Sequence, residues 1–182
     1  PNVLWRNDGP GGSEGWIFTD VSSASATDAA IFGMGLAVGD YDSDGDLDLY
    51  VTDVGDSEFL ENRGDGTFLN VTERTGTGRG TLSDDLPVDA SAGWGAVFAD
   101  LNNNGLLDLY YVAGHTDYNE RLIELDFSTA RVVARLFQTA LRQPNAVFMN
   151  AGDGTFLDVS HLSGADDDGI GREVAYADFN ND

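Results

Sequence analysis

The sequence predicts an all-β protein built from repeats of short antiparallel strands. A nine-residue loop rich in aspartate occupies residues 40–48 and 100–108, and begins again at residue 178. A second motif, Asn-x-Gly-Asp-Gly-Thr-Phe, occurs at 62–68 and again at 150–156. Apolar residues alternate with polar ones in segments such as 46–51, which is the period of a strand. Repetition of this kind determines the architecture before any single element is considered.

The aspartate-rich loops carry the donor pattern of a calcium site. Oxygen-bearing side chains recur at positions 1, 3, 5 and 9 of each complete loop, with Gly45 or Gly105 at position 6 to permit the sharp turn. Calcium takes six to eight oxygen ligands, and the position-7 carbonyls of Asp46 and Leu106 are expected to add one each. The expected ligands are Asp40, Asp42, Asp44, Asp46 and Asp48 in the first loop, Asp100, Asn102, Asn104, Leu106 and Asp108 in the second, and Asp178, Asn180 and Asp182 in the third.

Other interpretations of these loops fit less well. An EF-hand loop has a bidentate Glu at position 12 and flanking helices, whereas Val51 and Tyr111 stand there and strand-forming residues follow. The chain has no Cys and no His in the loops, so zinc is disfavoured. Magnesium retains its waters and suits a dedicated protein cage less than calcium does. Purely solvated acidic turns are the remaining alternative, and repetition argues against them.

The second motif predicts a hairpin, because Asp-Gly between apolar runs favours a tight turn. A looser copy, with a glycine-rich expansion, spans residues 7–22. The repeats are expected at about 1–56, 57–114 and 145–182, within a single unit covering 1–182. Residues 115–144 form an insertion in which the apolar spacing predicts a helix at about 128–142. This helix either packs on the side of the domain or docks a partner.

The two motifs together resemble the FG-GAP/VCBS repeat family of integrin-α-like propellers, near its ASPIC/UnbV-associated, cartilage-acidic-protein-like group. Residues 33–51 and 150–156 carry the resemblance. It implies β-propeller blades of four antiparallel strands, with calcium bound in a loop between two strands. It implies a binding or structural role, commonly extracellular, and does not imply a reaction. Since propellers have four to eight blades, we expect a partial propeller completed by sequence beyond Asp182 or by another chain. An open array of the same repeats is the alternative architecture.

Composition limits the partners. The chain has 32 acidic residues and nine basic ones, for a net charge of −23, which disfavours nucleic acid and anionic membranes. No apolar run is long enough to span a membrane. Calcium modules of low affinity suit extracellular, cell-surface or periplasmic conditions. We therefore expect an extracytoplasmic module for protein or glycan binding, adhesion or assembly. The alternative is the N-terminal part of a secreted, polysaccharide-active propeller enzyme with its catalytic residues outside this chain.

Several smaller features also attract attention. Arg63-Gly64-Asp65 spells an adhesion tripeptide, but Gly and Asp recur in the other hairpin and so belong to the turn. Asn70 lies in a glycosylation sequon that such a repeat can produce by chance. His115 and His161 are expected in surface loops. The three tryptophans are expected in blade cores rather than as sugar-binding platforms; they are Trp5, Trp16 and Trp94.

Overall fold

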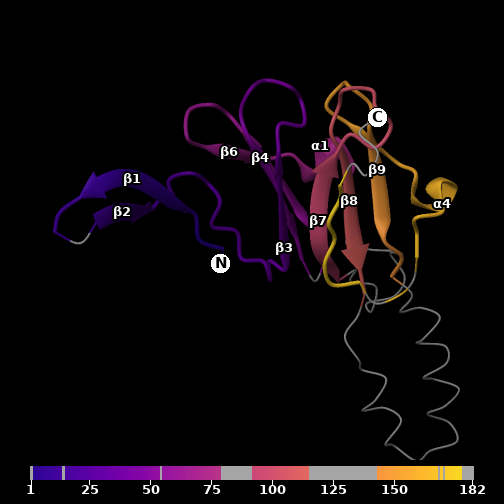
Figure 1. The fold of residues 1–182 in the computed structure, drawn as a ribbon, viewed down its shortest axis with the longest axis horizontal. Helices are drawn as coiled ribbons and strands as arrows, with labels where there is room; N and C mark the ends of the chain where they lie inside the picture. The colour runs from indigo at the N-terminus through magenta and orange to yellow at the C-terminus, as the bar shows by residue number, and fades with distance from the viewer. Residues whose placement is uncertain are drawn as a thin grey trace, which may run out of the picture.

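Segments of alternating apolar residues form short antiparallel strands joined by glycine-containing turns. The computed structural model describes residues 2–13, 15–53, 55–78, 92–114, 143–167, 169 and 171–177. Within these ranges, the strands form one hairpin and two four-stranded sheets, which Figure 1 shows side by side. Both four-stranded sheets are antiparallel meanders, so the predicted class of all-β blades with four antiparallel strands is confirmed.

The two sheets have the same construction. The first has the order β3-β4-β5-β6, and the second has the order β7-β8-β9-β10. Each aspartate-rich loop joins the first two strands of its sheet, and a one-turn helix follows the last strand. The first set is β3 (Gly35–Gly39), β4 (Asp48–Thr52), β5 (Glu58–Asn62), β6 (Phe68–Asn70) and α1 (Thr72–Thr75). The second set is β7 (Gly93–Ala99), β8 (Asp108–Ala113), β9 (Ala146–Asn150), β10 (Phe156–Asp158) and α4 (Ser160–Ser163).

The core lies between the two sheets and is largely aromatic. Phe59 of β5 is fully buried, and its ring centroid lies 5.6 Å from that of Phe98 on β7 and 5.8 Å from that of Phe156 on β10. Tyr41, which follows β3, lies 4.6 Å from Phe59 by the same measure. Centroid separations of 4.5–7 Å suit tilted and offset aromatic pairs, so these rings join the sheets face to face.

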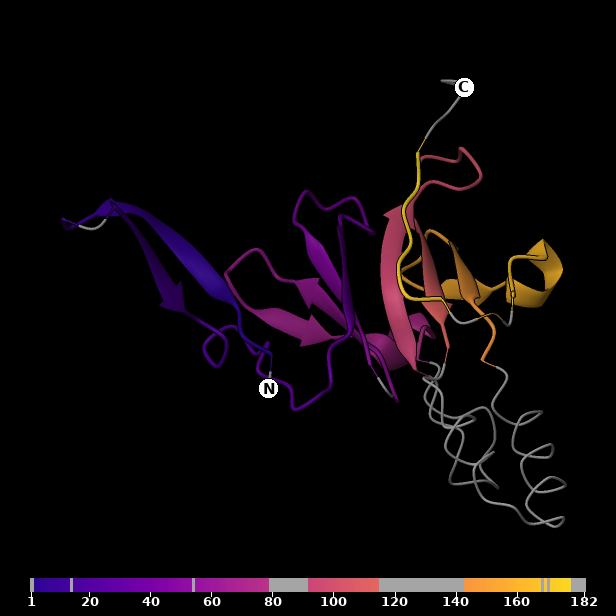
Figure 2. The ribbon, with the colours of Figure 1, turned by 60° about the horizontal axis from the view of Figure 1, so that its bottom comes forward.

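Glycine allows the first strands of successive sheets to approach closely. A Cβ on Gly35 of β3 would collide with the backbone carbonyl of Trp94 on β7. A Cβ on Gly95 would lie 2.8 Å from the backbone nitrogen of Val174. The segment 171–177 therefore follows β7 as β7 follows β3, and the Gly95 amide donates a 3.0 Å hydrogen bond to the Arg172 carbonyl. Figure 2 shows this segment, in yellow, running beside β7.

The N-terminal hairpin stands apart from the two sheets in Figure 1. It pairs β1 (Trp5–Gly11) with β2 (Gly15–Asp20) and has a register shift between Asn7 and Gly9. Trp5 and Trp16 are 57% and 65% exposed, so their predicted place in a blade core is wrong. No described sheet covers this hairpin, which is the physical reason. Trp94 differs, because its ring lies 4.1 Å beneath the Arg172 guanidinium and its indole N–H donates to the Gly114 carbonyl.

Other details of the chain were not predicted. The one-turn helices α1 and α4 were missed because four residues are too few for helical periodicity; both end at a glycine with positive φ, at 72° and 71°. The expected repeat boundary at 56/57 falls between β4 and β5, which pair within one sheet. The repeat limits and the single-unit assignment stay predictions. The predicted helix at 128–142, like His115, lies outside the described residues.

Candidate metal-binding loops

The two complete aspartate-rich loops leave their sheets at the same end, as Figure 1 shows. Each is flanked by strands rather than helices, as expected from the residues that follow position 9. Both loops use the same backbone conformation. Ser43 and Asn103 at position 4 have φ of 61° and 57°, and the glycines at position 6 have φ of 98° and 86°. Two sequences that differ at most positions therefore form the same turn.

Side-chain oxygens at positions 1 and 3 fold each loop inwards. In the first loop, the Asp44 amide donates to Asp40 Oδ1 at 3.1 Å and to Asp42 Oδ1 at 3.3 Å, while the Gly45 amide donates to Asp40 Oδ2 at 3.1 Å. The second loop has the same three hydrogen bonds. Asn104 N donates to Asp100 Oδ1 and Asn102 Oδ1, both at 3.0 Å, and Gly105 N donates to Asp100 Oδ2 at 2.8 Å.

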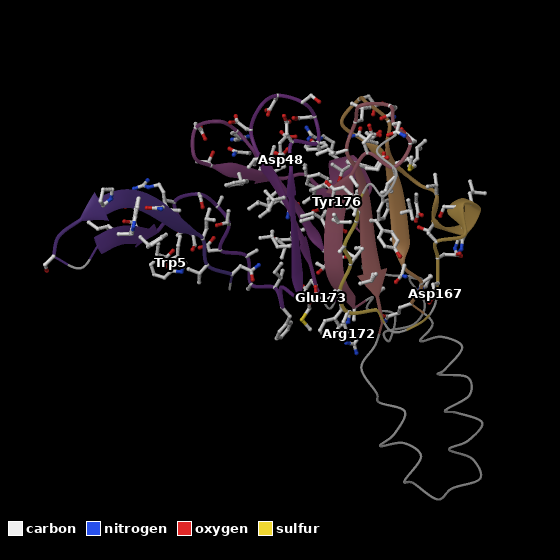
Figure 3. All side chains as sticks on the ribbon, viewed as in Figure 1. Trp5, Asp48, Asp167, Arg172, Glu173 and Tyr176 are labelled. Atoms are coloured by element: carbon white, nitrogen blue, oxygen red, sulfur yellow. The ribbon has the colours of Figure 1, made fainter. Side chains whose placement is uncertain are left out.

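The aspartate at position 9 is the buried anchor of each loop. Asp48 is 1% exposed, and it accepts hydrogen bonds from the Tyr41 amide at 3.2 Å and the Asn62 amide at 2.8 Å. Asp108 is fully buried and accepts the equivalent bonds from the amides of Leu101 and Asn150. These contacts connect the loop to its own first residues and to the third strand of its sheet. Figure 3 shows Asp48 at the loop end of the first sheet.

Negative charge accumulates in the first loop. One carboxylate oxygen from each of Asp40, Asp42 and Asp48 lies within 4.8 Å of the other two. Burial raises the pKa of Asp48 to about 6, against the opposing effect of its two amide donors. Burial, followed by the charge of Asp44, also raises the pKa of Asp42. A cation among these oxygens would offset both the desolvation and the repulsion.

The donor chemistry of both loops fits a hard cation. Every converging side chain in either loop offers oxygen, the type of ligand that calcium takes. The first loop has carboxylates at positions 1, 3, 5 and 9, whereas the second has two carboxylates and two amides. Asp44 and Asn104 each accept a hydrogen bond from the amide two residues later, at 2.9 and 2.8 Å. Asp178, Asn180 and Asp182 lie outside the described residues, so the third loop stays a prediction.

Two asparagines support the loops, and the sequence marks them only as part of a repeated motif. Asn62 Nδ2 donates to the Leu47 carbonyl at 3.2 Å, and Asn150 Nδ2 donates to the equivalent Leu107 carbonyl at 3.1 Å. Asn150 Nδ2 also donates to the Tyr41 carbonyl in the first loop, at 2.8 Å. Each asparagine therefore holds position 8 of its loop. The signal was the recurrence of Asn at the start of both hairpin motifs.

A polar triad beside the first loop was missed. The Tyr41 hydroxyl donates to Glu61 Oε2 at 2.5 Å, and the Arg74 guanidinium contacts both of these groups. Burial, followed by the Glu61 carboxylate, raises the pKa of Tyr41. Leu101 occupies the position of Tyr41 in the second loop, so the second blade does not form this triad. No pattern in the sequence marks these three residues as neighbours.

The side chains of the other conspicuous motifs take part in local turns and hydrogen bonds. Gly64 has a φ of 70° and Asp65 accepts hydrogen bonds from Thr67, so this part of the tripeptide is a hairpin turn. The Asn70 side-chain oxygen accepts from the amide and hydroxyl of Thr72. His161 lies on the surface with its Nδ1 atom 2.6 Å from Asp166.

Stacked four-stranded blades with oxygen-rich loops define this chain as a β-propeller type of repeat protein. Residues 40–111 match the model of the FG-GAP-like repeat, so this part of the chain belongs to that repeat family. It is 30% identical over 145 residues to cartilage acidic protein 1 of Xenopus tropicalis. The match includes 74% of this chain and 22% of that relative, so the chain spans about a fifth of the relative's length.

Proposed function

We propose that this chain is a calcium-binding β-propeller module that acts outside the cytoplasm and binds a protein or glycan partner. The observation that carries the proposal is the convergence of the Asp40 and Asp42 carboxylates on the buried carboxylate of Asp48. The second loop repeats its hydrogen bonds with a different set of side chains. Calcium would neutralise the first cluster and fix both loops, and Asp178, Asn180 and Asp182 would begin a third site.

The family assignment and the charge support a binding role. FG-GAP-like repeats form blades that present loops, and a net charge of −23 favours cationic surfaces over nucleic acid. Within the described ranges, no helix is long and apolar enough to cross a membrane. Adhesion or assembly through the loop end of the blades is the role that this arrangement serves best. We propose no catalytic residue in this chain.

Calcium titration of the metal-free chain by calorimetry tests the proposal. We expect saturable binding at both complete loops, tighter at the first because it has four carboxylates where the second has two. Asp42→Ala should abolish the tighter calcium-binding event, and Asn102→Ala should abolish the weaker one. Both side chains are exposed, so the fold should survive either change.

The control for these variants is Asp28→Asn, which alters an exposed aspartate outside the loops and should keep both events. Magnesium should bind at least about tenfold more weakly, since it demands octahedral geometry and retains its waters. The loops would be only solvated turns if the chain bound no calcium at millimolar concentrations, or if the loop variants bound calcium as the parent chain does.

Calcium affinity should fall as the solution is acidified from pH 7.5 to pH 5. Asp48 must lose its proton to bind metal, and its pKa is raised to about 6, so below that value each pH unit should weaken the first site by up to about tenfold. The stability of the metal-free chain should change in the opposite direction. The native state holds the extra proton between the ordinary aspartate value of 3.8 and about 6, so its stability should rise as pH falls through this window.

Titrations and urea unfolding at several pH values measure both effects. In the variant Asp48→Asn, neither the calcium affinity nor the stability of the metal-free chain should show a change centred near pH 6. Equal calcium affinity at pH 7.5 and pH 5 in the parent chain would contradict the role assigned to this carboxylate.

A further inference from the structure

The N-terminal hairpin has the sequence of the outer half of a blade. In both complete blades, the third and fourth strands carry a motif that begins with Asn, continues to a Phe and ends in Val followed by Ser or Thr. The hairpin of β1 and β2 carries the same residues in the same order. The matching positions are Asn7, Asn62 and Asn150; Phe18, Phe68 and Phe156; Val21, Val71 and Val159; and Ser22, Thr72 and Ser160.

The hairpin also has the hydrogen bonds of an outer half. Its Ser22 hydroxyl accepts a bond from the Leu4 amide at 2.8 Å, and the Val21 amide donates to the Leu4 carbonyl at 3.0 Å. The first blade has both bonds, at 2.8 Å each, between the corresponding residues. The second blade has them at 3.0 and 2.9 Å. Leu4 therefore corresponds to Phe59 and to Val147.

The described residues contain no inner pair of strands for the blade to which β1 and β2 would belong. In the complete blades, β5 pairs with β4 on the edge opposite β6, and β9 pairs with β8 opposite β10. Across the described part of the chain, β1 has β2 as its only strand neighbour. In both complete blades, the amide of the motif's Asn donates to the position-9 aspartate of a loop, at 2.8 Å. Asn7 occupies that position in the hairpin.

The facing surface of the first sheet is apolar and open. Leu36 and Val38 on β3 are 56% and 49% exposed, whereas Phe98, which corresponds to Val38, is buried against the first blade. On β8, the residues that correspond to Leu49 and Val51 of β4 are at most 1% exposed. A groove of about 340 Å³ separates this surface from the base of the hairpin. Its lining includes Val3, Leu4, Leu36, Leu49, Val51 and Leu60.

We propose that the β1 edge and this groove receive a strand–loop–strand pair of the kind formed by residues 35–52. The pair would complete a blade whose outer half is β1 and β2. Its second strand would pair with β1 and place an apolar or aromatic side chain beside Leu4, as Tyr50 pairs with Phe59. Its loop would place a position-9 aspartate at the Asn7 amide, adding a calcium site.

The occupant is a further repeat of the same protein rather than a second copy of this chain. Both complete strand–loop–strand pairs in the described residues already have their own outer strands, β5 with β6 and β9 with β10. The segment 171–177, which would begin a further pair, is held beside β7 of its own chain by the hydrogen bond from the Gly95 amide to the Arg172 carbonyl. A second copy could donate a pair only by opening a finished sheet. A further repeat that has no outer strands of its own carries no such cost.

A graft in the full chain tests the proposal. Residues 33–56 are copied and joined directly to Asn2, replacing Pro1. This repeats the native connection, because Asn2 corresponds to Ser57 when Asn7 is aligned with Asn62. We expect amide exchange within β1 to slow at least tenfold, the melting temperature to rise by about 5–10 °C, and calorimetry to show one additional calcium.

Two variants of the grafted chain serve as controls. Leu36→Asp should abolish the added protection of β1, because it places a charge in the groove. Leu157→Asp, on a similarly exposed residue of β10, should leave the protection intact. A graft of scrambled order that protects β1 equally, or a native graft that leaves β1 exchange unchanged, would overturn the proposal. Concentration-dependent dimers of the ungrafted chain with a protected β1 would overturn the choice of occupant.

Discussion

Removing calcium with a chelator is expected to lower the melting temperature of this chain by about 10–20 °C. A ligand that binds only the native state at about 100 times its dissociation constant stabilises that state by about 2.7 kcal/mol. Two such sites contribute about 5 kcal/mol, and each kcal/mol shifts the midpoint of a domain of this size by about 2–4 °C. With dissociation constants near 0.1 mM, about 10 mM calcium would give this occupancy. Thermal unfolding followed by circular dichroism measures the shift.

The controls separate a loop effect from a general effect of salt. Equal ionic strength with magnesium should restore much less of the melting temperature than calcium does. Asp42→Ala combined with Asn102→Ala should melt near the chelated parent and respond little to calcium, whereas Asp28→Asn should respond as the parent does. Identical melting curves for the parent with calcium and with chelator would mean that the loops hold their shape without a cation.

Gly35→Ala is expected to destabilise the chain by about 3 kcal/mol or more, or to prevent folding. A Cβ at Gly35 would collide with the Trp94 carbonyl oxygen and lie 3.0 Å from the Thr52 hydroxyl. The carbonyl is backbone, so the new atoms fit only if the first strands of the two sheets separate. Overpacking typically costs about 1–3 kcal/mol where side chains can adjust, and here they cannot. Urea unfolding with and without calcium measures the change.

Gly11→Ala is the matched control. It adds one carbon to another strand glycine that lacks a positive φ, but its nearest contacts are side-chain atoms of Ile17 on an exposed hairpin. This variant should lose less than about 1 kcal/mol, in keeping with exposed sites where a neighbour can move. Comparable losses at Gly11 and Gly35 would show that the close approach of the sheets contributes nothing specific.

The blade structure could be predicted because its signals are local and repeated. The spacing from Asp40 to Asp48 specifies a loop, the residues after it specify a strand, and the motif that starts at Asn62 specifies a hairpin. Each signal lies within about ten residues, and each occurs again in the second blade. The convergence of Asp40, Asp42 and Asp48 follows from the same short spacing.

The features that were not predicted depend on contacts between distant residues. The triad of Tyr41, Glu61 and Arg74 joins a loop, a strand and a one-turn helix through side chains that no spacing rule connects. The exposure of Trp5 depends on whether a sheet covers it, and apolar character alone does not reveal that. The frame of the repeat is ambiguous in sequence for a related reason, since a cyclic pattern has no natural first strand.

The amide of Asn150 has a consequence for recognition. It holds its own loop through Leu107 and the preceding loop through Tyr41, while the contact of Gly35 with Trp94 joins the same two blades at the first strands. Adjacent blades are thus fixed at two separate points, so neither can tilt without breaking one of them. The negative charges of the two loops are therefore held at a fixed distance from each other. A partner that spanned both loops would be selected by the spacing of its cationic groups as well as by their number.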